Sequence, residues 1–368
     1  MRKNRNMNPK SPPTPLLTEQ RPAMNKRSKL LWSVLFIIMA ATVYAVISQS
    51  RSFSFRAFTS YIAGTSKGWL LAAFAGMLGF IVFEGAAIAV ICRAFGYPIR
   101  PRRGFAYSAS DIYFSAITPS ATGGQPACAY FMIKDGIPGT VTAIALLANL
   151  SMYTVSILII GIASLLSHPS LFLSFGTLSQ VLIVFGCILQ ALLSAFFFLL
   201  LVKSSLLHGI CRKGLHFLCK IRLIKHEEQR QNKLDRYMEE YAAYADMLKQ
   251  HKGTLVKVFF LNLIERMSIL SVSLFVFLSA GGAASQAPDI WAIQCYSVIG
   301  SNAIPIPGAM GVSDYILLDG FGKIIPSYQS ALNLELLSRS LSFYVCVIVC
   351  GITTAIKYLI QRKQRKLQ

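Results

Sequence analysis

The stretch of sequence that decides the fold interrupts an apolar run, residues 104–134, with Thr118-Pro119-Ser120-Ala121-Thr122-Gly123-Gly124-Gln125-Pro126. A second apolar run, residues 288–322, is interrupted by Pro305-Ile306-Pro307-Gly308-Ala309-Met310-Gly311-Val312-Ser313-Asp314. Proline removes a backbone donor and glycine loosens the backbone, so neither run forms one straight helix. We predict two broken helical hairpins. Irregular backbone at membrane depth persists only where it is buried in protein or lines a water-filled cavity.

The composition of the chain places these hairpins in a membrane protein. Of 368 residues, 54% are hydrophobic and only 14% are charged, with a mean hydropathy of +0.53, whereas soluble domains carry about 25% charged residues. These values exclude a disordered chain, a disulfide scaffold and an ordinary cytosolic enzyme. A bilayer core needs about 20 apolar residues in a helix, and six segments meet or approach that length: 30–50, 69–92, 139–167, 178–202, 255–280 and 338–356. The predicted fold is an all-α polytopic membrane protein with about six spanning helices and two broken hairpins.

The basic residues indicate which side of the membrane each segment faces. The formal net charge is +21, and most Lys and Arg gather at 1–29, 93–103, 203–253 and 357–368. Because basic loops stay on the cytoplasmic side, these regions and both termini are predicted to be cytoplasmic, and nucleic acid is not a predicted partner. One hairpin then starts and ends inside, and the other starts and ends outside, whether or not either fully spans. Hairpins that enter from opposite faces indicate an inverted repeat.

The same pattern divides the chain into regions. We predict a disordered basic cytoplasmic tail at 1–29, a transmembrane domain at 30–360 and a short basic cytoplasmic tail at 361–368. Within the loop 203–253, apolar residues recur at helical spacing from residue 227 to 251. This amphipathic helix either connects two spanning helices, which we favour, or binds a partner such as a separate subunit. A homo-oligomer is compatible with all of these features.

Both interruptions combine residue types that bind phosphate. Opened helix ends expose backbone N–H groups, and glycine lets a phosphate approach the backbone closely. We therefore predict that the two interruptions hold a lipid head group near the middle of the membrane. The alternative is that proline and glycine only shape tight turns, which we disfavour because the pattern occurs twice. The candidate head-group residues are Thr118, Ser120, Thr122, Gly123, Gly124, Gln125, Pro307, Gly308 and Gly311, with Arg266 and Arg339.

Three carboxylates lie within the apolar segments, namely Glu84, Glu265 and Asp314. Charges inside a membrane are rare and cost about 2.5–3.5 kcal/mol each, so these groups are candidates for binding a cationic amine or a coupling proton. Internal ion pairs, such as Glu265 with an Arg of another helix, are an alternative of equal weight. We expect the acidic residues nearer segment ends or in the outer loop to be solvated: Asp111, Asp289, Asp319 and Glu335.

Several catalytic motifs do not occur in the sequence. There is no Gly-x-x-x-x-Gly-Lys-[Ser/Thr] phosphate loop and no Gly-x-Ser-x-Gly nucleophile motif. The eight cysteines and five histidines show no zinc-ligand spacing. The sequence therefore predicts no cofactor, no metal and no catalytic residue.

The run from Ile117 to Ala127 resembles the signature of the lysylphosphatidylglycerol synthase transmembrane region. This flippase-like domain is the membrane part of the bacterial multiple peptide resistance factor. Residues 305–314 resemble its second signature, although such proteins more often have Gly-Gly in the middle and Glu at the position of Asp314. Arg339 occupies the place of an Arg that opens the last helix. The resemblance covers residues 30–360.

The resemblance implies a lipid-translocating domain in the bacterial cytoplasmic membrane. Full-length members join it to a synthase that transfers lysine from lysyl-tRNA to phosphatidylglycerol, which protects against cationic peptides. Because residues 1–368 show no synthase domain, we expect no enzyme activity of the chain by itself. We expect it to translocate lysyl-phosphatidylglycerol or phosphatidylglycerol. The alternatives are a membrane component of a lysyltransferase whose separate synthase docks on 203–253, a translocator of polyprenyl-phosphate-linked glycolipid, and a non-transporting scaffold.

Overall fold

The computed structural model describes residues 55–118, 121–220, 227–302, 304, 307–309 and 311–366. These residues form helices and connecting turns, and no strand occurs among them. The predicted all-α fold is therefore confirmed. The predicted tail at 1–29 and the predicted first spanning helix at 30–50 lie outside the described residues.

Five helical segments are long and apolar enough to cross a membrane: α3 (Lys67–Ala94), α6 (Gly139–Ser167), α8 (Thr177–Val202), α11 (Lys252–Ser279) and the continuous stretch Tyr328–Lys363. They correspond to the other five predicted spans, and the protein is a polytopic membrane protein. The last stretch begins ten residues before the predicted start at 338. It consists of α14 (Tyr328–Arg339), the π-helical turn η4 (Ser340–Val345) and α15 (Cys346–Lys366).

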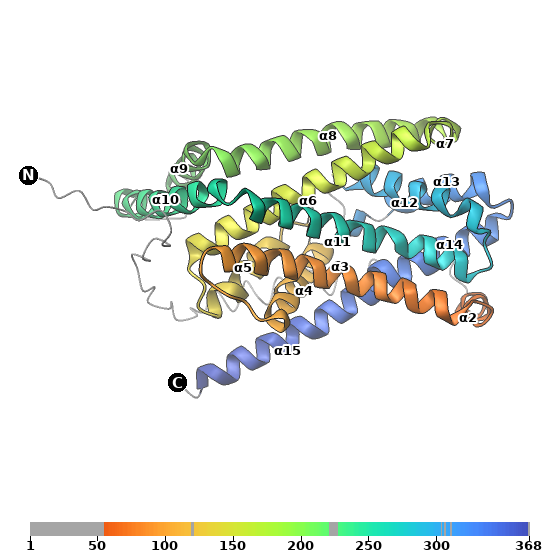
Figure 1. The fold of residues 1–368 in the computed structure, drawn as a ribbon, viewed down its shortest axis with the longest axis horizontal. Helices are drawn as coiled ribbons and strands as arrows, with labels where there is room; N and C mark the ends of the chain where they lie inside the picture. Colours follow the sequence, from red (N-terminus) through yellow and green to blue (C-terminus); the bar gives the residue numbers. More distant parts are fainter. Residues whose placement is uncertain are drawn as a thin grey trace, which may run out of the picture.

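The long helices lie side by side along the long axis of the molecule (Figure 1). One end of the bundle carries α9 (Ser204–Lys220), α10 (Glu227–Gln250) and the C-terminus. The opposite end carries the short helices α2 (Phe55–Ala63) and α7 (Pro169–Ser174), together with the start of α14. The two ends therefore correspond to the two sides of the membrane.

Both interrupted segments are broken where the sequence predicts. The first consists of α4 (Pro101–Ile117) and α5 (Gly124–Lys134), and the second of α12 (Ala287–Ser301), the 3₁₀ turn η3 (Pro307–Ala309) and α13 (Val312–Ile324). The α4–α5 hairpin begins at the end of the bundle that carries α10, whereas the α12–α13 hairpin begins at the end that carries α7 (Figure 1). The two hairpins thus enter the bundle from opposite ends.

The order of elements repeats across the two halves of the described chain. A long helix with a buried glutamate, α3 or α11, precedes a hairpin and then another long helix. The helices α3 and α11 run in opposite directions and share the most extensive helix contact of the fold. Their backbones approach closely at Gly76, which has no side chain. A Cβ atom there would lie only 2.8 Å from the carbonyl oxygen of Ser268. The predicted inverted arrangement is visible in this topology.

The helix predicted in the 203–253 loop forms as α10, and its apolar stripe packs under the bundle. Met238, Tyr241, Tyr244 and Leu248 are buried in a cluster that includes Phe95 at the end of α3. The Tyr244 ring meets the Phe95 ring edge-on, with centroids 5.2 Å apart. Burial of this stripe fixes α10 against the bundle.

Candidate functional site

The tip of the first hairpin is closed by local hydrogen bonds. The Thr118 hydroxyl donates to the carbonyl of Phe114 at 2.6 Å and accepts from the Gly123 N–H at 2.9 Å. Ala121 lies in the left-handed region with φ of 53°, where a side chain is strained. Thr122 is exposed, and Ser120 lies outside the described residues. The tip therefore presents a compact turn with polar side chains.

A carboxylate anchors this tip to its own hairpin. Asp111 of α4 accepts a hydrogen bond from the Gln125 side chain at 2.7 Å and another from the Ser115 hydroxyl at 3.1 Å. Gly124 makes this contact possible because a Cβ atom there would lie 2.1 Å from Asp111 Oδ1 and 2.6 Å from the Asp111 carbonyl. The requirement for glycine at 124 is thus steric. The glycine at this position is therefore explained without a contact between Gly124 and a phosphate.

The tip of the second hairpin holds an ion pair. Arg339 Nε lies 2.8 Å from Asp314 Oδ1, and a terminal nitrogen of Arg339 donates to the Gly308 carbonyl at 3.2 Å. The other oxygen of Asp314 accepts from the Gly311 N–H at 2.9 Å and so caps α13. Gly308 and Gly311 have φ of 61° and 82°, which glycine adopts without strain. The Gly311 N–H at the start of α13 therefore has its hydrogen-bond partner within the same helix, namely the Asp314 carboxylate.

The second tip contacts α4, the helix that leads to the first tip. The turn η3 contacts α4, and α15 packs along α4. A Cβ atom on Gly351 of α15 would lie 2.8 Å from the ring of Tyr113 on α4. The side chains of Asp314 and Arg339 are 32% and 15% exposed, so this pair can be reached from outside the packed core.

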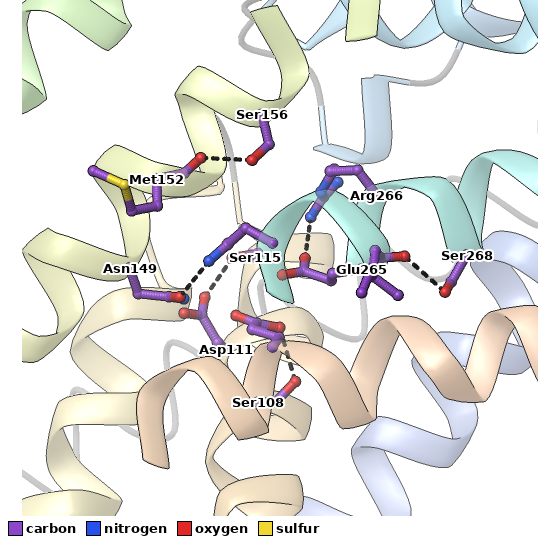
Figure 2. A network of polar contacts seen from close by, with 12 residues as sticks. Ser108, Asp111, Ser115, Asn149, Met152, Ser156, Glu265, Arg266 and Ser268 are labelled. Carbon is purple, nitrogen blue, oxygen red and sulfur yellow. Dashed lines mark hydrogen bonds and ion pairs between the residues drawn. The ribbon is translucent and has the colours of Figure 1, made fainter. Parts of the chain in front are cut away.

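A second group of charges lies deeper, where α3, α4 and α11 meet. Glu84 accepts from the Ser108 hydroxyl at 2.8 Å, and Glu265 accepts from Arg266 at 2.7 Å (Figure 2). The Arg266 guanidinium lies 4.0 Å from the ring centroid of Tyr153 and 4.8 Å from that of Phe80. Cation–π contact stabilises a guanidinium in such a position.

The predicted candidates therefore fall into separate groups. Glu84, Glu265 and Arg266 lie together in the buried group, and the partner of Glu265 is the adjacent Arg266, not an Arg of another helix. The second tip brings Asp314 and Arg339 together with Gly308 and Gly311. The first tip holds Thr118, Gly123, Gly124 and Gln125. The side chain of Pro307 is not among the described ones.

Two carboxylates that we expected to be solvated are buried, so that expectation was wrong for them. Asp111 is 5% exposed and Glu335 is 4% exposed. Two side-chain hydrogen bonds compensate Asp111 for lost water. Helical spacing could have predicted the burial of Asp111. Ser108, Asp111 and Ser115 share one face of an otherwise apolar helix. Likewise, Glu335 lies four residues before Arg339, on the same face of α14.

Another carboxylate, that of Asp135, connects the base of the first hairpin to the end of the last helix. Asp135 follows α5 and accepts hydrogen bonds from the Tyr107 hydroxyl, from Gln361 and from Lys357. Burial alone raises the pKa of Asp135, but the hydrogen bonds from Lys357, Tyr107 and Gln361 outweigh it and lower the pKa below its usual value. The ionised form of Asp135 is therefore favoured.

A family model described as "Lysylphosphatidylglycerol synthase TM region" matches residues 30–350. A comparison with curated proteins found no match. A comparison with solved structures found no match either.

Proposed function

Because this chain belongs to the lysylphosphatidylglycerol synthase TM region family, we propose that it moves an anionic or aminoacylated phospholipid between membrane leaflets. The family supports a role in the membrane that involves lipid. The lipid would be phosphatidylglycerol or its lysyl ester, and the membrane the bacterial cytoplasmic membrane, with both termini on the cytoplasmic side. Moving the lysyl lipid outward would contribute to resistance against cationic peptides.

The observation that carries this proposal is the pair of broken hairpins that enter from opposite ends and touch through η3 and α4. Unwound backbone at this depth suits a path for polar head groups. A site between two such hairpins can open to one leaflet and then to the other, while the acyl chains stay in the lipid. Rigid helices on either side, α3 and α11, supply the frame against which the hairpins move.

The Arg339–Asp314 pair matches the charges of a lysyl-phosphatidylglycerol head group. A guanidinium binds phosphate through parallel N–H donors, so the phosphate would replace Asp314 beside Arg339. The released Asp314 would receive a lysyl ammonium. The Asp314 side chain of this pair is 32% exposed, whereas the Glu265 side chain that pairs with Arg266 is 0% exposed, so the Arg339–Asp314 pair is the better head-group site.

The first tip would complete the site with neutral donors. Its Thr122 hydroxyl and the second amide hydrogen of Gln125 hydrogen-bond without adding charge, while Thr118 keeps the tip closed. Phosphatidylglycerol could therefore bind through phosphate alone, and the lysyl form through phosphate and amine. Arg266 would act as the counter-ion of the buried carboxylates, because it pairs with Glu265 and its guanidinium lies against the rings of Tyr153 and Phe80.

Leaflet movement in proteoliposomes tests the proposal. Fluorescent lysyl-phosphatidylglycerol and phosphatidylglycerol are placed in liposomes, and quenching from outside reports movement. We expect fast movement with the wild-type protein and with Gly68→Ala, whose added Cβ would contact nothing within 4 Å. Arg339→Ala should slow movement strongly, and Arg339→Lys should retain part of it because the charge remains.

Two outcomes would overturn the proposal. One is movement that Arg339→Ala leaves unchanged, which would remove the head-group site from the second tip. The other is no movement of either lipid by folded wild-type protein. Polyprenyl-phosphate glycolipids would then be assayed in the same liposomes. Formation of lysyl-phosphatidylglycerol from lysyl-tRNA, with a separate synthase added, would indicate the lysyltransferase alternative.

A further inference from the structure

The buried charges between α3, α4 and α11 do not balance. Glu84, Asp111 and Glu265 are 8%, 5% and 0% exposed, and the one cation among them, Arg266, is 9% exposed. If all were ionised, three negative charges would face one positive charge. An unpaired charge in a dry, low-dielectric site is very costly, and ordinarily the group becomes neutral instead.

The hydrogen bonds of the group leave one carboxylate oxygen unsatisfied. Glu84 receives a bond from Ser108, and Asp111 receives bonds from Gln125 and Ser115. Glu265 receives a bond at one oxygen from Arg266, but its fully buried Oε2 has no hydrogen-bond partner. Figure 2 shows the carboxyl groups of Glu265 and Asp111 turned toward the same space between α11 and α4. A proton on this group would supply the missing hydrogen.

No second cation faces these carboxylates from the described residues of the neighbouring helices. The other titratable groups that interact with them electrostatically are Tyr153 of α6, Cys128 of α5 and Cys350 of α15. All of these are neutral at pH 7 in their usual state. No group of three or more His, Cys, Asp and Glu in the described part of the chain is arranged to hold a metal ion. A buried carboxylate that lacks a cation ordinarily becomes neutral by taking up a proton.

We propose that Glu84, Asp111 and Glu265 form an exchangeable proton site that couples proton movement to the lipid movement proposed above. The site takes up a proton from water on one side, as an O–H bond forms at a carboxylate oxygen. It releases that proton to water on the other side when the hairpins have rearranged. Uptake breaks an O–H bond of hydronium, and release breaks the carboxyl O–H bond and forms one on a water molecule, so no other covalent bond changes.

Asp111 connects this site to the first hairpin tip. Its ionised form accepts from both Gln125 and Ser115, and Ser115 also bonds the Ala121 carbonyl at 3.4 Å. A protonated Asp111 is a donor at one oxygen, so either the bond with Ser115 reverses its direction or the bond from Gln125 breaks. Proton uptake would thereby change the hydrogen bonds that hold the tip.

The charge of the lipid explains why proton movement would be coupled to lipid movement. Lysyl-phosphatidylglycerol carries about one positive charge, and moving one charge outward against an inside-negative potential costs about 2.3 kcal/mol per 100 mV. Inward movement of one proton in exchange would cancel the charge transferred. Phosphatidylglycerol, with its single negative charge, would not need this exchange.

Infrared difference spectroscopy on the protein in liposomes, without any added lipid substrate, tests the proton site. We expect a protonated-carboxyl band whose intensity falls as the pH is raised. Glu84→Gln, Asp111→Asn or Glu265→Gln should remove or shift it. Asp289→Asn is the matched control, because that side chain is 41% exposed and lies far along the chain at the start of α12.

A second measurement needs no variant. Dicyclohexylcarbodiimide modifies protonated carboxyl groups in apolar surroundings, and peptide mass spectrometry should locate its pH-dependent adducts on Glu84, Asp111 or Glu265. The absence of both a titrating band and an adduct would overturn the proton site, even if lipid moves. A titrating site in a protein that moves no lipid would instead overturn the proposed function and leave the proton site standing.

Discussion

Replacing Gly124 with Ala should damage the first hairpin tip in a way that the structure quantifies. The added Cβ would lie 2.0 Å from the Ser115 hydroxyl and 2.1 Å from Asp111 Oδ1, and both side chains can turn away. It would also lie 2.6 Å from the backbone carbonyl of Asp111, which cannot turn away. The backbone of α4 or α5 must therefore shift to restore an ordinary contact. Such overpacking costs about 1–3 kcal/mol.

Thermal unfolding in detergent measures this cost. The matched control is Gly68→Ala, which is also at the start of a helix and gains the same helix propensity of about 1 kcal/mol, but whose Cβ meets nothing within 4 Å. We expect Gly124→Ala to unfold several degrees below the control, at about 2–4 °C per kcal/mol. It should also slow lipid movement, because the bond from Gln125 to Asp111 cannot form unchanged. Equal unfolding midpoints for the two variants would refute this reasoning.

Three further predictions concern other contacts. A double-mutant cycle of Arg339→Ala and Asp314→Ala should give a coupling free energy of about 0.5–3 kcal/mol, reduced by the partial exposure of Asp314. Tyr244→Ala should cost about 3–5 kcal/mol and speed proteolysis of residues 203–253, because its buried ring holds α10 against the bundle. Asp135→Asn should lower the unfolding midpoint at neutral pH. The folded-state pKa of Asp135 is lowered, so its stabilisation is full above the usual pKa of about 3.9 and is lost as pH falls through the lowered value.

Each of these predictions has a control. For Tyr244→Ala it is Glu239→Ala, an exposed position of the same helix, which should leave proteolysis unchanged. For Asp135→Asn, the midpoints of variant and wild type should converge in acid; a constant gap down to pH 2 would contradict the ion-pair explanation. Additive effects of Arg339→Ala and Asp314→Ala would show that the two side chains do not interact.

The breaks in the two hairpins could be predicted because their causes are local. Helix α4 ends at Ile117, just before a proline in the sequence that cannot continue a helix, and Gly308 and Gly311 supply the left-handed backbone of the second tip. The five described spans followed from hydropathy for the same reason. The basic loops gave the relative direction of the hairpins, which agrees with their entry from opposite ends (Figure 1).

The burial of Asp111 and the start of the last helix could not be predicted in the same way. Asp111 is buried because Gln125, fourteen residues later, folds back onto it, which is a tertiary contact. The stretch Tyr328–Ser338 has polar residues that lower its hydropathy, yet it is helical because Ser327 caps it and because α11 and α13 pack against it. Tertiary partners thus explain both differences.

The most direct test of the account is to locate the lipid head group on the protein. A phosphatidylglycerol with a photoreactive group on its head is incorporated into liposomes with the folded protein and irradiated, and cross-linked peptides are identified by mass spectrometry. The account predicts labels on the two tips, residues 118–125 and 307–314, and their loss in Arg339→Ala. Labels confined to the lipid-exposed face of α8, where Leu178, Phe185 and Leu192 are more than half exposed, would contradict it.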